Sequence, residues 1–478
     1  MHYVVKMINL LKNYITMTIL IFLSIFNSCS PPKYLYKIDG SRSLIHRINK
    51  IISDSGIDIN IGIQVLSLDN DKIIYDYNSQ KLLTPASTNK LYTCAAALYF
   101  LGKDYKFKTE ILLHEKNLIL KGGADPGLSI KQLDSLAYEI SKKYKYIDTL
   151  FIDHSFLDNI QFGKGWMWDS GSWPYNAAVS ALTVNDNCID FYTRPGVLGG
   201  KAIIDYFPKT SYIRLKNESL TVKDSITKKL KIEREWALNK NDFYAFGEVI
   251  DTSGLDTLRR NIYEPPVFTG TIFKESLEKN GTAVKHISTR QISHGKFRKL
   301  KTIYSRPLLF LAKDLMNKSN NLTAELMIKS IGALDTLPGT WEIGLDSVKT
   351  FLAREVLIDT TKIKIADGSG LSRYNLTSSA QLNSLLHWIY DSEYKETFIS
   401  TLPGGGYKNS TLENRLVNEG EIVRAKTGGL SGIRNLSGYL KSNRYGNVAF
   451  SILMNGFTDE SSRYTEIQDK IINTILYD

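Results

Sequence analysis

Alternating apolar and polar residues define the first element that the sequence predicts. The segment Ile61–Tyr77 alternates on both sides of an Asp-Asn-Asp turn signal at residues 69–71. Because successive side chains of a strand point to opposite faces, this pattern predicts a β-hairpin. Apolar residues then recur at spacings of three and four from Thr88 to Leu101, which predicts a helix. Ser87 is therefore expected where a loop enters a helix.

The pattern changes twice more along the chain. Between about residues 104 and 293 it consists of short β-rich pieces with few long helical patterns, which we interpret as one inserted region. Helical periodicity returns in four segments, 308–315, 322–333, 346–356 and 378–390. Near the C-terminus, alternation in 413–416, 422–432, 434–442 and 447–456 predicts a β-meander, and 465–477 a final helix.

The N-terminus has the pattern of an export signal. Lys6 and Lys12 precede an apolar run, Ile15–Phe26, which is followed by small and polar residues around Cys29. About a dozen apolar residues are too few to span about 30 Å of hydrocarbon as a helix, which favours cleavage over a permanent transmembrane anchor. We predict a signal peptide over residues 1–29, with Cys29 lipidated and the protein in the periplasm on the inner or outer membrane. The alternative is ordinary signal cleavage nearby.

Composition and charge narrow the class of protein. With 478 residues, 43% of them apolar and 23% charged, the chain is globular, and its length predicts two or three domains. The net charge of +11 comes without a long Lys/Arg block, so we predict no nucleic-acid partner and a dispersed basic surface that suits an anionic envelope polymer. Cys94 and Cys188 fit structural burial, and seven scattered His show no zinc-site spacing. We therefore predict no metal and no cofactor.

The first candidate for chemistry is Ser87-Thr88-Asn89-Lys90. A hydroxyl and an ammonium three residues apart share one face if a helix begins at Ser87. A lysine that burial neutralises can then take the serine proton. Alone, this spacing is common, and a helix N-cap with a surface lysine explains it equally well.

Two further motifs give this spacing a context. Ser319-Asn320-Asn321 precedes a predicted helix, and Lys426-Thr427-Gly428 lies on a predicted strand. The trio S-x-x-K, S-x-N and K-T-G, in this chain order, is the signature of β-lactamases and penicillin-binding proteins. Each motif alone is also compatible with a polar helix start or a strand-edge turn.

Attack on an amide carbonyl explains why these residue types are needed. The reaction requires an activated hydroxyl, a route for the proton to the leaving amine, and donors aimed at the developing oxyanion. Ser87 would be the nucleophile and Lys90 its base. Ser319 would relay the proton, and Asn321 would bind a substrate amide and orient Lys90. Lys426 would hold the carboxylate end of the substrate.

Longer segments resemble the class C low-molecular-mass penicillin-binding proteins, the D-alanyl-D-alanine carboxypeptidase/endopeptidase family. The separation of Ser87 from Ser319 matches the large insertion of that family, and the similarity runs from about residue 45 to the end. The matching segments are PASTNKLYT at Pro85, LKGGADPGLS at Leu120, GWMWDSGSWPYNAAVSAL at Gly165, SRPLLFLAKDLMNKSNNLTAELM at Ser305, ADGSGLSRYN at Ala366, LPGGGYKNSTLENRL at Leu402 and AKTGGLSGIRNLSGYL at Ala425.

The resemblance implies an α+β fold. A penicillin-binding transpeptidase (β-lactamase-like) domain, with a five-stranded antiparallel sheet flanked by helices, would consist of residues 30–104 and 294–478. Residues 105–293 would form two small β-rich domains. The implied function is that of a serine D,D-peptidase that acts on peptidoglycan stem peptides through an acyl-enzyme on Ser87 and binds β-lactam inhibitors. D-Ala-D-Ala carboxypeptidase and D,D-endopeptidase activity both remain open.

The resemblance also implies substrate-binding residues. The backbone N–H groups of Ser87 and Gly429 would form the oxyanion hole, next to Gly428. The family usually has Thr in place of Gly429, so Thr427 would bind the terminal carboxylate with Lys426, with weaker carboxylate selection. By similarity the stem-peptide side chain would be bound by Trp166, Asp169 and Arg373. Tyr175 and Leu430 would form walls of the same pocket.

Opposite charges on Asp169 and Arg373 would suit a zwitterionic side chain such as meso-diaminopimelate. The alternative is that both are structural residues between domains. Two other functions are compatible with the same fold: that of a β-lactamase or esterase, and that of a non-catalytic peptidoglycan-binding protein.

Overall fold

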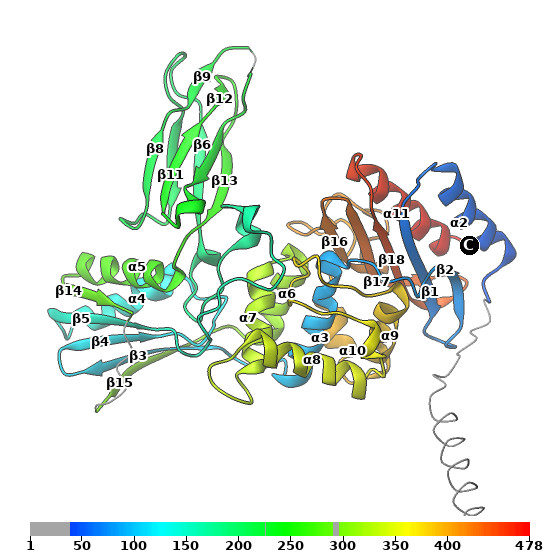
Figure 1. The fold of residues 1–478 in the computed structure, drawn as a ribbon, viewed down its shortest axis with the longest axis horizontal. Coiled ribbons are helices and arrows are strands. Elements are labelled where there is room, and N and C mark those ends of the chain that lie inside the picture. Colours follow the sequence, from blue (N-terminus) through cyan, green and yellow to red (C-terminus); the bar gives the residue numbers. More distant parts are fainter. Residues whose placement is uncertain (1–38, 225, 290–295) are drawn as a thin grey trace, which may run out of the picture.

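The computed structural model describes residues 39–224, 226–289 and 296–478. Figure 1 shows two lobes, one that contains the N-terminal and C-terminal parts of the chain and one built from the middle of the sequence. The predicted signal peptide and Cys29 lie outside the described residues. Within the described ranges, none of the helices is both long and apolar enough to cross a membrane.

A five-stranded antiparallel sheet forms the centre of the first lobe, in the order β16-β17-β18-β1-β2. Its strands are β1 (Asn60–Ser67), β2 (Ile73–Tyr77), β16 (Val423–Leu430), β17 (Ile433–Ser442) and β18 (Gly446–Asn455). Alternate residues of β1, such as Ile61 and Ile63, pack against α2 (Arg42–Asp54) and α11 (Ser461–Leu476). The opposite face packs against α9 (Ser379–Asp391) and the helices around it. The predicted hairpin and meander are thus present, but residues 413–416 form turns and not a strand.

The helices on that opposite face position the chemical motifs. They are α3 (Lys90–Phe100), α6 (Leu308–Lys318), α7 (Asn321–Gly332), α8 (Trp341–Arg354), α9 and α10 (Lys395–Ile399). Helix α3 is buried from Lys90 to Leu98, which explains why its sequence is apolar on all sides. It begins at Lys90 and not at Ser87, because residues Ala86–Asn89 form a 3-10 turn.

The second lobe begins with a five-stranded mixed sheet, in the order β14-β5-β4-β3-β15. Its strands are β3 (Lys108–His114), β4 (Asn117–Lys121), β5 (Tyr146–Asp153), β14 (Ala283–Ser288) and β15 (Arg298–Tyr304). Because β4–β5 and β5–β14 are parallel pairs, crossovers are required, and α4 (Ile130–Ser141) and α5 (Pro265–Lys279) lie in them. The mostly β-rich inserted region therefore contains two helices, α4 and α5, and since β15 pairs with β3, the inserted sheet extends to Tyr304, beyond residue 293.

A smaller β-rich unit projects from this lobe (Figure 1). Its sheets have the orders β13-β6-β7, β10-β11-β8 and β12-β9. The strands are β6 (Cys188–Arg194), β7 (Ile203–Phe207), β8 (Arg214–Asn217), β9 (Leu220–Val222), β10 (Lys231–Arg234), β11 (Asp242–Phe246), β12 (Glu248–Ile250) and β13 (Asp256–Asn261). The insertion thus contains two units, and both share one apolar core that includes Ile152 and Phe191.

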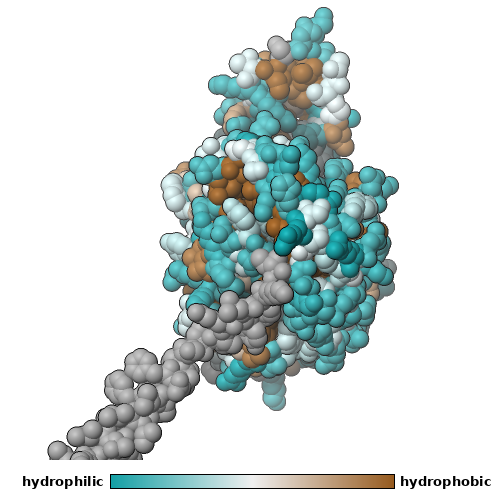
Figure 2. Space-filling view, turned by 90° about the vertical axis from the view of Figure 1, so that its right-hand side faces the viewer, coloured by the Kyte–Doolittle hydropathy of each residue, from teal (hydrophilic) through white to brown (hydrophobic). Residues whose placement is uncertain are grey.

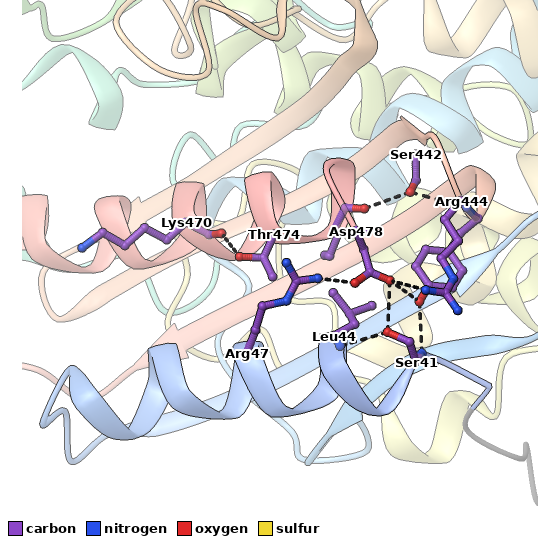
Figure 3. Close-up of polar contacts among 10 residues, drawn as sticks. Ser41, Leu44, Arg47, Ser442, Arg444, Lys470, Thr474 and Asp478 are labelled. Atoms are coloured by element: carbon purple, nitrogen blue, oxygen red, sulfur yellow. Dashed lines mark hydrogen bonds and ion pairs between the residues drawn. The ribbon is translucent and has the colours of Figure 1, made fainter.

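The C-terminal residue ties α11 to the start of α2 (Figure 3). The Asp478 carboxylate accepts hydrogen bonds from Ser41 Oγ at 3.1 Å and Tyr445 OH at 2.8 Å. It also forms ion pairs with Arg47 and Arg444. Figure 2 views the molecule from this end, and its surface is mostly hydrophilic with separate small apolar patches.

Candidate active site

The candidate nucleophile, Ser87, lies in the tight 3-10 turn that leads into α3. Ala86 adopts a positive φ of 48°, and the Asp367–Gly370 loop packs directly on this turn. A Cβ on Gly370 would lie 1.8 Å from the carbonyl oxygen of Ala86, and Gly370 has a φ of 83°. Glycine is therefore required for the loop to approach Ser87 this closely.

Lys90 connects the loop and the nucleophile. Its fully buried ammonium donates hydrogen bonds to Ser87 Oγ at 2.9 Å, Asn321 Oδ1 at 2.7 Å and the Ser369 carbonyl oxygen at 2.6 Å. Burial lowers the pKa of Lys90 to about 7, although the nearby carboxyl groups of Glu325 and Asp367 act in the opposite direction. Near neutral pH a large fraction of Lys90 is thus an uncharged amine, which can accept the Ser87 proton.

The second motif forms the joint between two helices. Ser319 follows the last turn of α6 with a left-handed φ of 58°. Asn320 caps α7, because its side chain accepts a hydrogen bond from the Thr323 N–H at 2.9 Å. Asn321 can therefore point its amide towards Lys90, while its Nδ2 donates to the Tyr175 carbonyl at 3.0 Å.

The third motif lies on β16, at the edge of the central sheet. Lys426 is fully buried, and its Nζ donates to the Thr427 carbonyl at 2.9 Å. Burial and the proximity of Lys90 hold the pKa of Lys426 well below its usual value. A Cβ on Gly428 would lie 2.6 Å from the Pro85 carbonyl oxygen, so this glycine lets β16 pack against the Ser87 turn.

The three motifs meet at one open cleft of about 860 Å³. Ser87, Ser319 and the stretch from Thr427 to Leu430 all line it. The structure therefore brings together the hydroxyl, the amine, the asparagine and the strand edge that the sequence motifs predicted. This arrangement can activate a serine for attack on a carbonyl in a bound peptide.

The sequence model of the D-Ala-D-Ala carboxypeptidase 3 (S13) family matches residues 44–474. The chain belongs to this family. A D-alanyl-D-alanine carboxypeptidase of Actinomadura sp. (strain R39) is 30% identical over 436 residues, which cover 86% of this chain and 80% of the relative. D-alanyl-D-alanine carboxypeptidase DacB of Haemophilus influenzae is 28% identical over 84% of this chain and 86% of the relative.

Comparison with solved structures supports the same fold. The crystal structure of penicillin-binding protein 4 from Haemophilus influenzae has a TM-score of 0.78 at 23% identity, and the match covers 90% of this chain and 99% of that structure. The predicted family, the fold class and the enzyme class, a serine-type D-Ala-D-Ala carboxypeptidase, are therefore confirmed.

In this S13 family member, the residues expected to bind the side chain of the stem peptide lie on several different surfaces. Leu430 lines the cleft with Ser87. Trp166 donates its indole N–H to Asp367 Oδ2 at 2.9 Å and lines a separate cavity of about 340 Å³. Tyr175 is near the centre through its carbonyl group, which accepts the Asn321 hydrogen bond.

The two charged members of the set do not line the main cleft. Asp169 is exposed in the short 3-10 turn Trp168–Ser170. Arg373 donates to the Ser431 carbonyl at 3.0 Å and lines an adjacent cavity that shares Ser431 and Gly432 with the cleft. The role of this pair in substrate binding stays a prediction.

Sequence reasoning missed a buried carboxylate behind the site. Glu325 accepts hydrogen bonds from the N–H groups of Gly368 at 2.8 Å and Ser369 at 2.7 Å, and from the Trp341 indole at 2.8 Å. Because Ser369 in turn accepts the Lys90 hydrogen bond, Glu325 positions one ligand of the base. A charged residue inside the apolar helical segment 322–333 was the available signal.

Asp367 is the second buried carboxylate that the sequence did not reveal. It accepts hydrogen bonds from the N–H groups of Gly370 at 2.8 Å and Ser372 at 2.6 Å, and from Asn375 Nδ2 at 2.8 Å. These bonds fold the 366–375 loop back on itself. The loop can then present the Ser369 carbonyl to Lys90.

Proposed function

We propose that this S13 family member hydrolyses the D-Ala-D-Ala bond of peptidoglycan stem peptides through an acyl-enzyme on Ser87. The observation that carries the proposal is the hydrogen bond from a buried Lys90, with its pKa lowered to about 7, to Ser87 Oγ at 2.9 Å in an open cleft. The names of the relatives, which are D-alanyl-D-alanine carboxypeptidases, support the substrate class.

In the acylation step, uncharged Lys90 takes the hydroxyl proton while Ser87 Oγ forms a bond to the penultimate D-Ala carbonyl carbon. The N–H groups of Ser87 and Gly429 would stabilise the oxyanion. When the carbon–nitrogen bond breaks, the proton reaches the leaving amine through Ser319. The products of this step are the acyl-enzyme and an amine.

Water then hydrolyses the ester and restores the Ser87 hydroxyl. The leaving amine is free D-Ala in a carboxypeptidase reaction and a cross-linked neighbouring peptide in an endopeptidase reaction. The same bonds form and break in both cases. The proposal therefore includes both activities, and their balance depends on what the cleft accepts beyond the scissile bond.

We further propose that the stem-peptide side chain contacts the region around Trp166, Asp169, Tyr175, Arg373 and Leu430. Asp169 and Arg373 are both exposed and carry opposite charges, as a zwitterionic diaminopimelate side chain would require. Trp166 donates a hydrogen bond to Asp367 in the 366–375 loop, and the Tyr175 carbonyl accepts one from Asn321 at the start of α7. Small movements of the 161–176 segment would therefore reach the active site.

Export to the periplasm with a lipid anchor on Cys29 is part of the same proposal. The support is the N-terminal sequence, a basic region followed by a short apolar run and a cysteine. A peptidoglycan hydrolase needs this location, because its substrate lies outside the cytoplasmic membrane.

The deciding experiment compares two digests by the purified chain without its first 29 residues. Release of D-Ala from a diacyl-D-Ala-D-Ala peptide and conversion of cross-linked muropeptide dimers to monomers are measured side by side. Ser87→Ala is the control and should lose both activities and all covalent labelling by a fluorescent penicillin. Undiminished labelling of Ser87→Ala would overturn the assignment of the nucleophile.

The alternatives predict different results in the same assays. A β-lactamase would turn over penicillin rapidly and leave both peptide substrates intact. A non-catalytic binding protein would show neither labelling nor peptide turnover.

A further inference from the structure

Gly429 and Arg434 lie directly opposite each other on the neighbouring strands β16 and β17. A Cβ placed on Gly429 would come within 2.9 Å of Arg434 Nη1. The guanidinium therefore occupies the space that a side chain at position 429 would need. Both residues line the same cleft as Ser87 and Thr427.

The local contacts of Arg434 leave its charge without an acidic partner. Its Nη1 donates to the carbonyl groups of Leu430 at 3.2 Å and Ile433 at 2.8 Å. Over residues 39–224, 226–289 and 296–478, no carboxylate forms an ion pair with Arg434. Within the described part of the chain, the side-chain hydrogen bonds of Arg434 all come from Nη1, so Nε and Nη2 remain available to a ligand.

The other charged groups that line the cleft are already paired. Arg415 binds Asp469 at 2.6 Å, and Asp459 binds Arg463 at 2.9 Å. Partial burial and the charge of Arg415 lower the pKa of Arg434. An anion beside Arg434 would offset both effects, because it stabilises the charged guanidinium. Among the described residues that line the cleft, Arg434 is thus the cation without an acidic partner, and it shares this cleft with the candidate nucleophile.

The lysine of the K-T-G motif is less suited than Arg434 to bind an anion in this cleft. Lys426 is fully buried, and its ammonium is directed to the Thr427 carbonyl. A guanidinium keeps its charge throughout the physiological pH range and can bind a carboxylate through two parallel hydrogen bonds.

We propose that Arg434 binds the terminal carboxylate of the substrate and replaces the hydroxyl that is absent at Gly429. The inference rests on the proposed D-Ala-D-Ala hydrolysis and deepens it. It differs from the expectation that Thr427 would bind the carboxylate with Lys426 and with weaker selection, which stays a prediction. Arg434 makes a free C-terminal carboxylate a strong determinant of specificity.

The test compares two substrates that share one acyl-D-Ala group. One ends in D-Ala with a free carboxylate, and the other is the p-nitroanilide, which has none. Arg434→Ala should lower kcat/KM about 10–100-fold for the carboxylate peptide and less than about threefold for the anilide. Arg434→Gln, which keeps more of the side-chain volume, should show the same selective loss.

Two further variants make the test specific. Lys441→Ala removes a positive charge from an exposed site at the other end of β17 and should not change the ratio between the substrates. Gly429→Thr added to Arg434→Ala should recover part of the lost selectivity, because it supplies a hydroxyl in the space that Arg434 has left.

Equal losses on both substrates, or an unchanged rate on the carboxylate peptide, would overturn the role of Arg434. If the wild-type chain releases no D-Ala, the proposed function itself fails. The two failures are therefore distinguishable in a single set of measurements.

Discussion

Lys90 donates a hydrogen bond to Ser87 Oγ over 2.9 Å from a position that solvent does not reach. Its other two hydrogen bonds go to Asn321 and to the Ser369 carbonyl, which hold the amine in place. Burial lowers the pKa of Lys90 to about 7 and thus prepares it as a base.

The rate of acylation should depend on pH through Lys90. Only the uncharged amine can accept a proton, and its fraction rises as the pH passes through a pKa of about 7. Second-order acylation by penicillin should therefore fall towards tenfold per pH unit below that point and level off above it. Stopped-flow fluorescence measures this profile. A flat profile between pH 5 and pH 8 would argue against Lys90 as the base.

Removal of the amine should slow the same step. General-base assistance contributes about 10²–10⁴ in rate, so Lys90→Ala should acylate slower by a factor in this range. The remaining activity should also lose the pH dependence assigned to Lys90. An acylation rate within about threefold of wild type would remove Lys90 from the mechanism.

Glu325→Gln should affect both stability and the pH profile. One amide oxygen cannot replace two carboxylate oxygens that accept three hydrogen bonds, so a buried N–H loses its acceptor. The free energy of unfolding should fall by about 1–3 kcal/mol in urea denaturation. The ionised Glu325 carboxyl raises the pKa of Lys90, but burial and the nearby Asp367 raise the pKa of Glu325 itself to about 7. Its loss should therefore move the acidic limb to lower pH only to the extent that Glu325 is ionised there.

A matched variant controls this experiment. Glu466→Gln changes the same functional group at an exposed position of α11 and should alter neither property. A stable Glu325→Gln protein whose profile moves to higher pH would contradict the assigned electrostatic role.

Asp169→Ala tests how the side chain of the stem peptide is bound. A lost charge-assisted hydrogen bond costs about 1.5–3 kcal/mol, but only for ligands that make it. The variant should therefore lose kcat/KM for peptides with diaminopimelate, while a simple diacyl-D-Ala-D-Ala and penicillin acylation change little. Equal losses on both peptides would indicate that Asp169 supports the structure.

Cys29→Ser tests the proposed lipid anchor. The wild-type protein should fractionate with membranes, and the variant should be released into the soluble periplasmic fraction. Western blots of separated fractions measure both. A variant that stays with the membrane would mean that a different anchor operates.

Part of this protein was readable from local pattern alone. Strand alternation on both sides of the 69–71 turn and in 422–456 predicted all five central strands closely, and it placed the K-T-G motif on β16. Helical spacing placed Ser87 just before the buried helix α3 and Asn321 at the start of α7. These features depend on residues within a few positions of each other, which a periodic pattern reports directly.

Other features depended on contacts between distant segments. The parallel pairs of the inserted sheet, and with them α4, α5 and the extension to Tyr304, follow from which strands meet and not from any one strand. The cluster of Glu325, Ser369 and Lys90 unites three parts of the chain, and only its assembly in a dry interior lowers the pKa of Lys90.

Gly429 and Arg434 show the same difference between what the sequence determines and what the tertiary structure determines. The sequence alone determined that a hydroxyl was absent at position 429 of the K-T-G-x stretch. Only the tertiary structure decided what fills that space, because the antiparallel register of β16 and β17 sets Arg434 opposite Gly429 and the surrounding fold turns both into the cleft.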